Sequence, residues 1–93
     1  MTMTVKKEPN RFYLDDDQGR TVAEITIVAG EQNTLIIDHT FVDESLRGQG
    51  IAARLVEVVV TDAREQNKTI VPACPFAEKE FESHPDYRDV LAT

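Results

Sequence analysis

Hydrophobic and polar positions alternate with a period of two through the first half of the chain, which predicts β-strands. Short polar segments rich in Gly, Asn and Asp separate four such stretches. We expect strands over Thr4 to Glu8, Arg11 to Leu14, Thr21 to Val28 and Leu35 to Val42. Because the connections are short, consecutive strands are expected to pair antiparallel as a meander.

The two longer strands are each expected to have two different faces. In the third strand, one face holds Val22, Glu24, Thr26 and Val28, and the other holds Ala23, Ile25 and Ile27. In the fourth strand, strict alternation places Leu35, Ile37, His39 and Phe41 on one face and Ile36, Asp38, Thr40 and Val42 on the other. A histidine is thereby predicted on a largely apolar face.

The period changes to that of a helix after Asp43. Apolar residues recur at Ile51, Leu55, Val58, Val59 and Ala63, so a helix is expected from about Gly50 to Gln66. Thr69 to Ala73 predicts a short strand, which follows a helical crossover and should therefore pair parallel to an earlier strand. A second helix is expected over Pro75 to Ser83, with Phe76, Ala77 and Phe81 facing inward, and one more turn over Asp86 to Leu91. The predicted fold class is α+β, with antiparallel strands followed by a β-α-β-α unit.

Length and composition favour one domain spanning residues 1–93. No apolar run approaches the ~20 residues that cross a bilayer, and the N-terminus has no apolar core of a secretory signal, so we expect a cytoplasmic protein. Seventeen acidic residues against ten basic ones give a net charge of -7, which opposes nucleic-acid binding. Cys74 is the single cysteine, so we expect neither an internal disulfide nor a metal site.

A glycine-containing segment, Arg47-Gly48-Gln49-Gly50-Ile51-Ala52, joins the longest strand to the main helix. The unpaired amides and the dipole at a helix start attract anions, and glycine lets the backbone approach a phosphate closely. Arg47 adds a charge-assisted contact. These features predict a diphosphate-binding turn, and a simple strand-to-helix turn is the alternative interpretation.

Of three phosphate-binding sequence patterns, one fits this turn. The P-loop pattern fails because no Gly-Lys-Ser/Thr follows. The dinucleotide pattern matches Gly48 to Ala53 in letters, but it requires a preceding first strand and an acidic residue at the end of the next strand. The pattern Arg/Gln-x-x-Gly-x-Gly/Ala fits Arg47 to Ala52, with antiparallel strands before it and a crossover helix after it.

The turn and its surroundings resemble the GNAT superfamily of N-acetyltransferases, most closely its small stand-alone branch. The resemblance rests on Asp38 to Ala52 and on Pro72 to Ala77, followed by Phe81 and His84 to Tyr87. It implies acetyl-CoA as the cofactor, with the diphosphate held by Arg47, Gly48, Gln49, Gly50, Ile51 and Ala52. It also implies that the strand from Leu35 and the strand from Thr69 splay apart, so that backbone groups near Phe41 and Val42 bind the pantetheine arm.

Two residues are candidates for the chemistry. Cys74 precedes Pro75, which suits the first position of a helix, and a thiol at a helix start has a lowered pKa. The resemblance implies that His39 lies beside the acetyl group, and its ordinary pKa of ~6.5 suits proton transfer near neutrality. Simple packing of Cys74 and a structural, hydrogen-bonded His39 are the alternatives. Glu24 and Asp38 are alternative bases.

The expected function is transfer of an acetyl group from acetyl-CoA to a small-molecule or peptide amine. Direct attack by the amine and relay through an acetylated Cys74 both fit the residues, and direct attack is the common route in the resembling superfamily. A CoA-binding or protein-interaction module without efficient catalysis is the second hypothesis, because the pattern predicts none of the additional elements that shape the acceptor pocket of larger members. We expect no nucleic-acid or membrane partner, and a monomer or weak homodimer.

Overall fold

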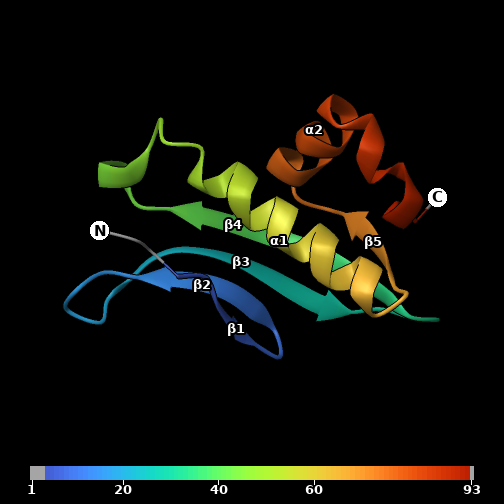
Figure 1. The fold of residues 1–93 in the computed structure, drawn as a ribbon, viewed down its shortest axis with the longest axis horizontal. Coiled ribbons are helices and arrows are strands. Elements are labelled where there is room, and N and C mark those ends of the chain that lie inside the picture. Colours follow the sequence, from blue (N-terminus) through green and yellow to red (C-terminus); the bar gives the residue numbers. More distant parts are fainter. Residues whose placement is uncertain (1–3, 93) are drawn as a thin grey trace.

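The computed structural model describes residues 4–92, which form one five-stranded sheet with helices attached to its second half (Figure 1). The strand order is the sequence order: β1 (Lys6–Glu8), β2 (Arg11–Asp15), β3 (Thr21–Ala29), β4 (Thr34–Val42) and β5 (Thr69–Pro72). Neighbours pair antiparallel from β1 to β4, and β5 joins β4 in parallel. The expected meander followed by a parallel strand is confirmed.

The helices follow β4 and β5 as the sequence predicts. They are η1 (Glu44–Leu46), α1 (Ile51–Glu65), α2 (Pro75–Ser83) and η2 (Pro85–Val90). Gly50 and Gln66, the expected ends of the main helix, are its N-cap and C-cap. Asn67 follows with a φ of 56°, and the amide of Lys68 donates to the carbonyl of Ala63 at 2.8 Å, which ends α1 and turns the chain toward β5.

One face of the sheet, the covered face, packs against α1. The helix contributes the buried side chains Leu55, Val56, Val59, Val60 and Ala63. They join a single core with sheet residues such as Ile25, Ile37 and Ile70, each with no exposed surface. Removal of this apolar surface from water is the main stabilising term for so small a fold.

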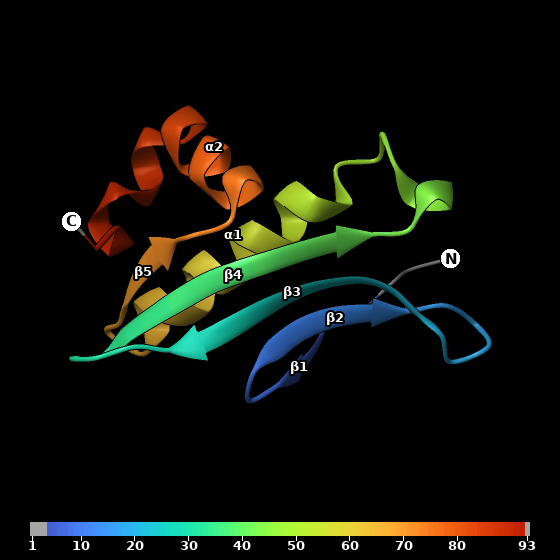
Figure 2. The same cartoon turned by 180° about the vertical axis from the view of Figure 1, so that it is seen from behind.

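The opposite face of the sheet, the open face, has no described helix over it. Figure 2 shows β2, β3 and β4 from this side, with α1 behind them and α2 beyond β4, near β5. The strand registers place Tyr13, Glu24, Thr26, Val28, His39 and Phe41 on the open face. Two large apolar side chains among them are exposed, Val28 at 47% and Phe41 at 41%.

A β-bulge in β4 changes the faces that strict alternation predicts. Thr26 of β3 pairs with His39, whereas the next residue, Ile27, pairs with Ile37, so Asp38 is an extra residue in β4. A bulge of this kind places two successive side chains on one side of the sheet and reverses the alternation beyond it.

The predicted grouping of His39 and Phe41 with Leu35 and Ile37 is therefore wrong. Beyond the bulge, Thr40 lies opposite buried Ile25 on the covered face. His39 is exposed and lies with Phe41 on the open face. The hydrophobic pattern could not reveal the extra residue. Residues 38 to 40 are all polar, so the pattern is compatible with β4 both with and without a bulge.

Replacing Leu55 with Ala should lower the free energy of unfolding by about 2–5 kcal/mol, because the side chain is fully buried between α1 and the sheet. Urea denaturation followed by circular dichroism measures the change. Val28→Ala on the open face is the control and should cost less than about 1 kcal/mol. An equal loss in both variants would contradict a core confined to the covered face.

Candidate functional site

The turn between β4 and α1 is built by local hydrogen bonds and two glycines. Asp43 caps η1 by accepting from the amide and the hydroxyl of Ser45, at 3.1 and 2.5 Å, and these bonds hold the pKa of its carboxyl below the ordinary value. Gly48 and Gly50 have φ values of 84° and 72°, a region that costs residues with a side chain energy. The glycines therefore fix the path by which the chain enters α1.

The first turn of α1 presents backbone donors without partners inside the helix. The first helical hydrogen bond runs from the amide of Arg54 to the carbonyl of Gly50 at 3.0 Å, so the amides of Ile51, Ala52 and Ala53 precede it. Gly50, the N-cap, has no side chain to satisfy them. A Cβ built on Gly48 or Gly50 would meet no atom within 4 Å other than those of the adjacent residues, so the space beside the two glycines is open. Such a turn fits a diphosphate, for which the helix dipole adds partial positive charge.

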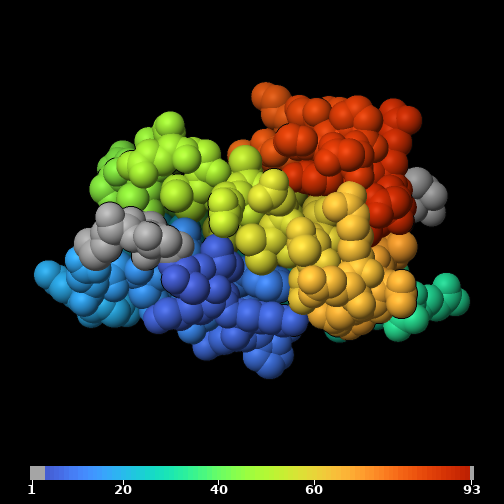
Figure 3. Space-filling view, in the orientation of Figure 1, coloured from blue at the N-terminus to red at the C-terminus, as the bar shows by residue number. Residues whose placement is uncertain are grey.

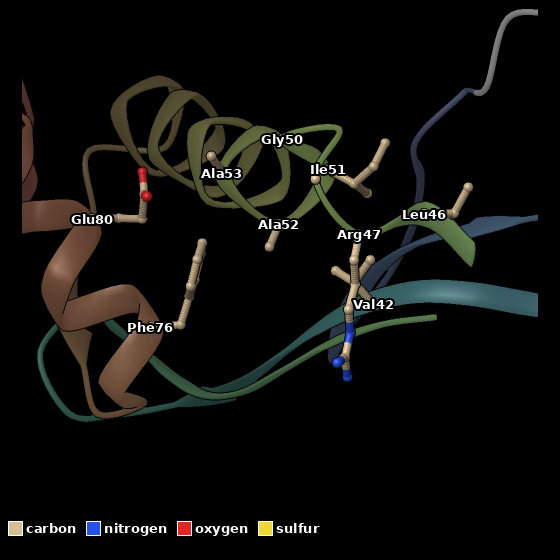
Figure 4. A pocket seen from close by; sticks show the side chains of 10 residues that line it. Val42, Leu46, Arg47, Gly50, Ile51, Ala52, Ala53, Phe76 and Glu80 are labelled. Carbon is tan, nitrogen blue, oxygen red and sulfur yellow. The ribbon is translucent and has the colours of Figure 1, made fainter. Parts of the chain in front are cut away.

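A cavity of about 310 Å³ adjoins the turn, between the start of α1 and α2. Its lining comes from β4, the turn and both helices: Val42, Leu46, Arg47, Gly48, Gly50, Ile51, Ala52, Ala53, Phe76 and Glu80. In the close-up, Phe76 of α2 and Ala52 of α1 lie on opposite sides of the space, and the Arg47 guanidinium points away from Glu80 (Figure 4). The space-filling view shows a notch in the surface between the yellow-green start of α1 and the red helical region (Figure 3).

Phe76 is part of this cavity and not of the core, contrary to the expectation that it faces inward. It is 36% exposed, whereas Phe81 is buried and meets Tyr87 edge to face with the ring centroids 5.4 Å apart. The buried residues of α2 are Ala77 and Phe81, whereas Phe76, the second residue of the helix, lines the cavity.

β4 and β5 separate next to this cavity, as the splayed pair was predicted to do. The parallel ladder ends at Ile37 and Pro72, and the amides of Ala73 and Cys74 both donate to the Ile37 carbonyl, at 3.0 and 3.1 Å. β4 continues to Val42 with no strand on that side among the described residues. This leaves an edge of β4 facing the gap.

Alternation of the ladder decides which residues of β4 offer backbone groups to that edge. The amide of Asp43 donates to Val22 of β3 at 2.7 Å. In an antiparallel pair, successive residues direct their backbone groups to opposite sides, so Val42 and Thr40 direct theirs away from β3. The backbone of Phe41 is directed to β3. Of the two residues expected to hold a pantetheine arm, the geometry favours Val42.

Cys74 lies at the gap as the N-cap of α2, with Pro75 at the first helical position, and is 8% exposed. Its Sγ is 3.4 Å from the hydroxyl oxygen of Thr40. Burial raises the pKa of the Cys74 thiol, but hydrogen bonds from the Thr40 hydroxyl and from the amides of Ala77, Phe76 and Thr40 outweigh burial and lower it. The lowered pKa agrees in direction with the expectation for a thiol at a helix start.

Thr40 is a residue that the sequence reasoning missed. It was assigned to a face by strict alternation, and only the bulge at Asp38 turns it toward Cys74. The signal in the sequence is a hydroxyl within two residues of the end of a strand that leads to a glycine turn, which is too common to identify a site.

His39 and Cys74 lie on opposite sides of β4. The three candidate bases, His39, Glu24 and Asp38, share the open face, where the Asp38 carboxylate accepts a hydrogen bond from the Thr26 hydroxyl. Glu24 lies 3.8 Å from the guanidinium of Arg11. The structure therefore places a thiol on the covered side of the gap and the candidate bases on the open side.

The described residues contain no group of three or more His, Cys, Asp and Glu side chains placed to hold a metal ion. None of the described helices is both long enough and apolar enough to cross a membrane.

Comparison with known proteins gives one family match and several structural matches. The model of the GCN5-related N-acetyltransferase family matches residues 11–90. A GCN5-like protein of Staphylococcus aureus, assigned as an N-acetyltransferase, has a solution structure that matches with a TM-score of 0.80 and 39% identity, over 96% of this chain and 87% of that chain. Among curated proteins, none matches this chain.

Two larger enzymes show the same fold. The GNAT-family N-acetyltransferase YhbS of Escherichia coli, in complex with CoA, matches with a TM-score of 0.56 and 26% identity, over 64% of this chain and 37% of that chain. The ribosomal-protein-alanine N-acetyltransferase of Brucella melitensis matches with a TM-score of 0.60 and 22% identity, over 89% and 63%. This chain spans less than two thirds of each of these proteins. On the family match and the Staphylococcus structure, this chain belongs to the GCN5-related N-acetyltransferases, a family of acyltransferase enzymes.

Proposed function

We propose that this chain binds acetyl-CoA at the start of α1 and transfers the acetyl group to a primary amine. The observation that carries the proposal is the continuity of three features. Unpaired amides at Ile51 to Ala53 open onto the cavity, the cavity is lined by Val42, and Val42 belongs to the free edge of β4 that leads to Cys74. A diphosphate on the helix start thereby directs a pantetheine arm along β4. The CoA bound to YhbS, a protein of the same fold, supports the assignment.

Different residues of the chain bind the different parts of CoA. Gly48 and Gly50 give the turn its path, and the amides of α1 and Arg47 bind the diphosphate. The backbone edge at Val42 binds the amides of the arm, since the Thr40 amide is already bonded to Cys74. Phe76 supplies apolar contact on the other side of the cavity. Acetyl-CoA would supply the activated acetyl group, and Thr40 and Cys74 are the residues that would line its thioester.

Direct attack by the amine suits the separation of His39 from Cys74. An ammonium group arriving from the open face would lose one proton to His39 and attack the acetyl carbonyl carbon as the neutral amine. The C–S bond would then break, and the CoA thiolate would leave into the gap and take up the second proton that the nitrogen loses as the amide forms. The thiol of Cys74, polarised by Thr40, lies on the departing side. Relay through Cys74 remains the competing route, because a thiol with a lowered pKa is a competent nucleophile.

Gly50→Asp should weaken CoA binding about tenfold or more, since the change adds a side chain and a negative charge before the amides of α1. Gly19→Asp is the matched control, because Gly19 has a φ of 81° and open space around its Cα but lies in the β2–β3 turn. Isothermal titration with CoA measures both affinities. Equal losses in the two variants would place the diphosphate elsewhere.

The thiol of Cys74 should react with iodoacetamide with a pH midpoint below the ~8.5 of a free thiol, because alkylation requires the thiolate and the hydrogen bonds stabilise it. Thr40→Val removes the hydroxyl and should raise the midpoint, while Thr40→Ser should restore it. Rates measured from pH 6 to 10 give the three midpoints. A wild-type midpoint at or above ~8.5, unchanged in Thr40→Val, would reduce Cys74 to a packing residue.

Cys74→Ser should retain substantial acetyl transfer to an amine if attack is direct, and CoA affinity should stay near that of the wild type. Intact-mass spectrometry after incubation with acetyl-CoA alone tests the competing route. A gain of ~42 Da on the Cys74 peptide that then passes to an added amine would establish the relay. Binding of CoA with neither transfer nor adduct across a set of amines would identify a binding module.

A further inference from the structure

A row of side chains crosses the open face beside the gap. It begins at Lys6 of β1, which lies opposite Tyr13 and is ion-paired with Asp15 at 3.4 Å, so Lys6 adds no net charge to the row. Tyr13 of β2 pairs with Glu24 of β3, and Glu24 pairs with Phe41 of β4. Directly opposed residues on one face of a sheet have their Cβ atoms about 4.5–5.5 Å apart, so Glu24 occupies the position between two aromatic residues. The row ends at β4, next to Thr40, whose hydroxyl contacts Cys74 on the other side of the strand.

One half of this row already holds a cation. The guanidinium of Arg11 lies over the Tyr13 ring, 3.8 Å from the centroid, and its Nη1 is 3.8 Å from Oε2 of Glu24. An aromatic face and a carboxylate together attract a positive charge, which is the arrangement seen here. The other half has the same composition, Glu24 and the ring of Phe41. Among the described residues, no Lys or Arg lies over that ring, and Phe41 is 41% exposed.

The charge around the row is negative after its internal pairs are counted. Arg11 is shared between Glu24 and Glu8, and it is held more closely by Glu8, at 2.6 Å. One positive charge therefore serves two carboxylates. Asp38, on the same face at the bulge, bonds to the Thr26 hydroxyl and forms no ion pair within residues 4–92. The excess of negative charge makes the part of the row formed by Glu24 and Phe41 complementary to an added cation.

The openness of the face indicates the size of the occupant. Sites for small molecules enclose most of the ligand surface in a concave pocket. Here His39, Asp38 and Phe41 are exposed on a sheet face with no described helix over it, and α1 and α2 lie elsewhere (Figure 2). A polypeptide segment brings enough surface of its own to be held on an open face, through several contacts in a row.

From this arrangement we infer that the open face docks a basic polypeptide segment, and that this segment carries the acetyl acceptor. One cationic side chain of the segment lies on the Phe41 ring beside Glu24, as Arg11 lies on Tyr13. A neighbouring lysine then reaches past His39 into the gap between β4 and β5. This inference names the acceptor class for the transfer proposed above and rests on that function for its catalytic consequence, although docking itself does not require catalysis.

The test is a titration of the CoA-saturated, ¹⁵N-labelled protein with two synthetic peptides of equal length, each with one central lysine. Arginines flank the lysine in one peptide and glutamates in the other, and spermidine is the third ligand. The arginine peptide should shift the amides of Glu24, His39 and Phe41 and bind at least ~10-fold tighter than the glutamate peptide at low salt. Equal affinities, shifts confined to other residues, or tighter binding of spermidine at the same amides would each overturn the inference.

Three variants assign the contacts. Glu24→Gln should weaken the arginine peptide by removing charge, and Phe41→Leu should weaken it by removing the ring while keeping an apolar side chain. Glu31→Gln is the matched control for charge, because Glu31 lies in the β3–β4 turn, at the other end of these strands. Thermal unfolding and the amide spectrum check that each variant is folded, and unchanged affinity in a folded Glu24→Gln and a folded Phe41→Leu overturns the inference.

The two proposals fail in different ways. Mass spectrometry of the same peptides after incubation with acetyl-CoA measures transfer separately from docking. Docking at Glu24 and Phe41 without any acetylation would leave the inference standing and remove the proposed transfer. Acetylation of the arginine and glutamate peptides at equal rates, undiminished in Glu24→Gln, would leave the transfer standing and remove the docking surface.

Discussion

The separation of β4 from β5 is the constraint on which the rest of the site depends. A strand that continues past its neighbour leaves backbone donors and acceptors without partners, and such an edge is costly unless something covers it. In this protein the ladder stops at Ile37, and the next residue, Asp38, is the bulge. The end of the ladder and the bulge therefore coincide, so β4 loses its neighbour β5 where its side chains change faces. The gap, the position of Cys74 and the exposure of His39 all follow from that point.

Because of the bulge, the end of β4 presents different functional side chains on its two faces. Thr40 points to the covered side, where it supports the thiol at the start of α2, and His39 and Phe41 point to the open side. A regular strand would have placed His39 and Phe41 in the core, at the cost of burying an imidazole without a partner. In the proposed reaction, the acyl donor on one side of β4 and the acceptor on the other meet at the gap without competing for the same space.

Much of the fold follows from local patterns in the chain. The period of two through Thr21 to Val28 and the period of the helix after Gly50 identify the main elements, because burial of one face of each is the dominant energy in a chain of this size. The glycine turn was also accessible to sequence reasoning. Its chemistry comes from main-chain amides and from the conformational freedom of Gly48 and Gly50, both of which are local.

The sequence by itself therefore determined the elements, their order and the glycine turn at the start of α1. The tertiary structure decided which side chains meet. Cys74 and Thr40 are 34 residues apart, and their contact exists because β5 ends beside the bulge in β4. Phe41 faces Glu24 and not the core for the same reason. A bulge shifts every later side chain to the other face, and it is set by the pairing of β4 with β3 and β5, which no local pattern contains.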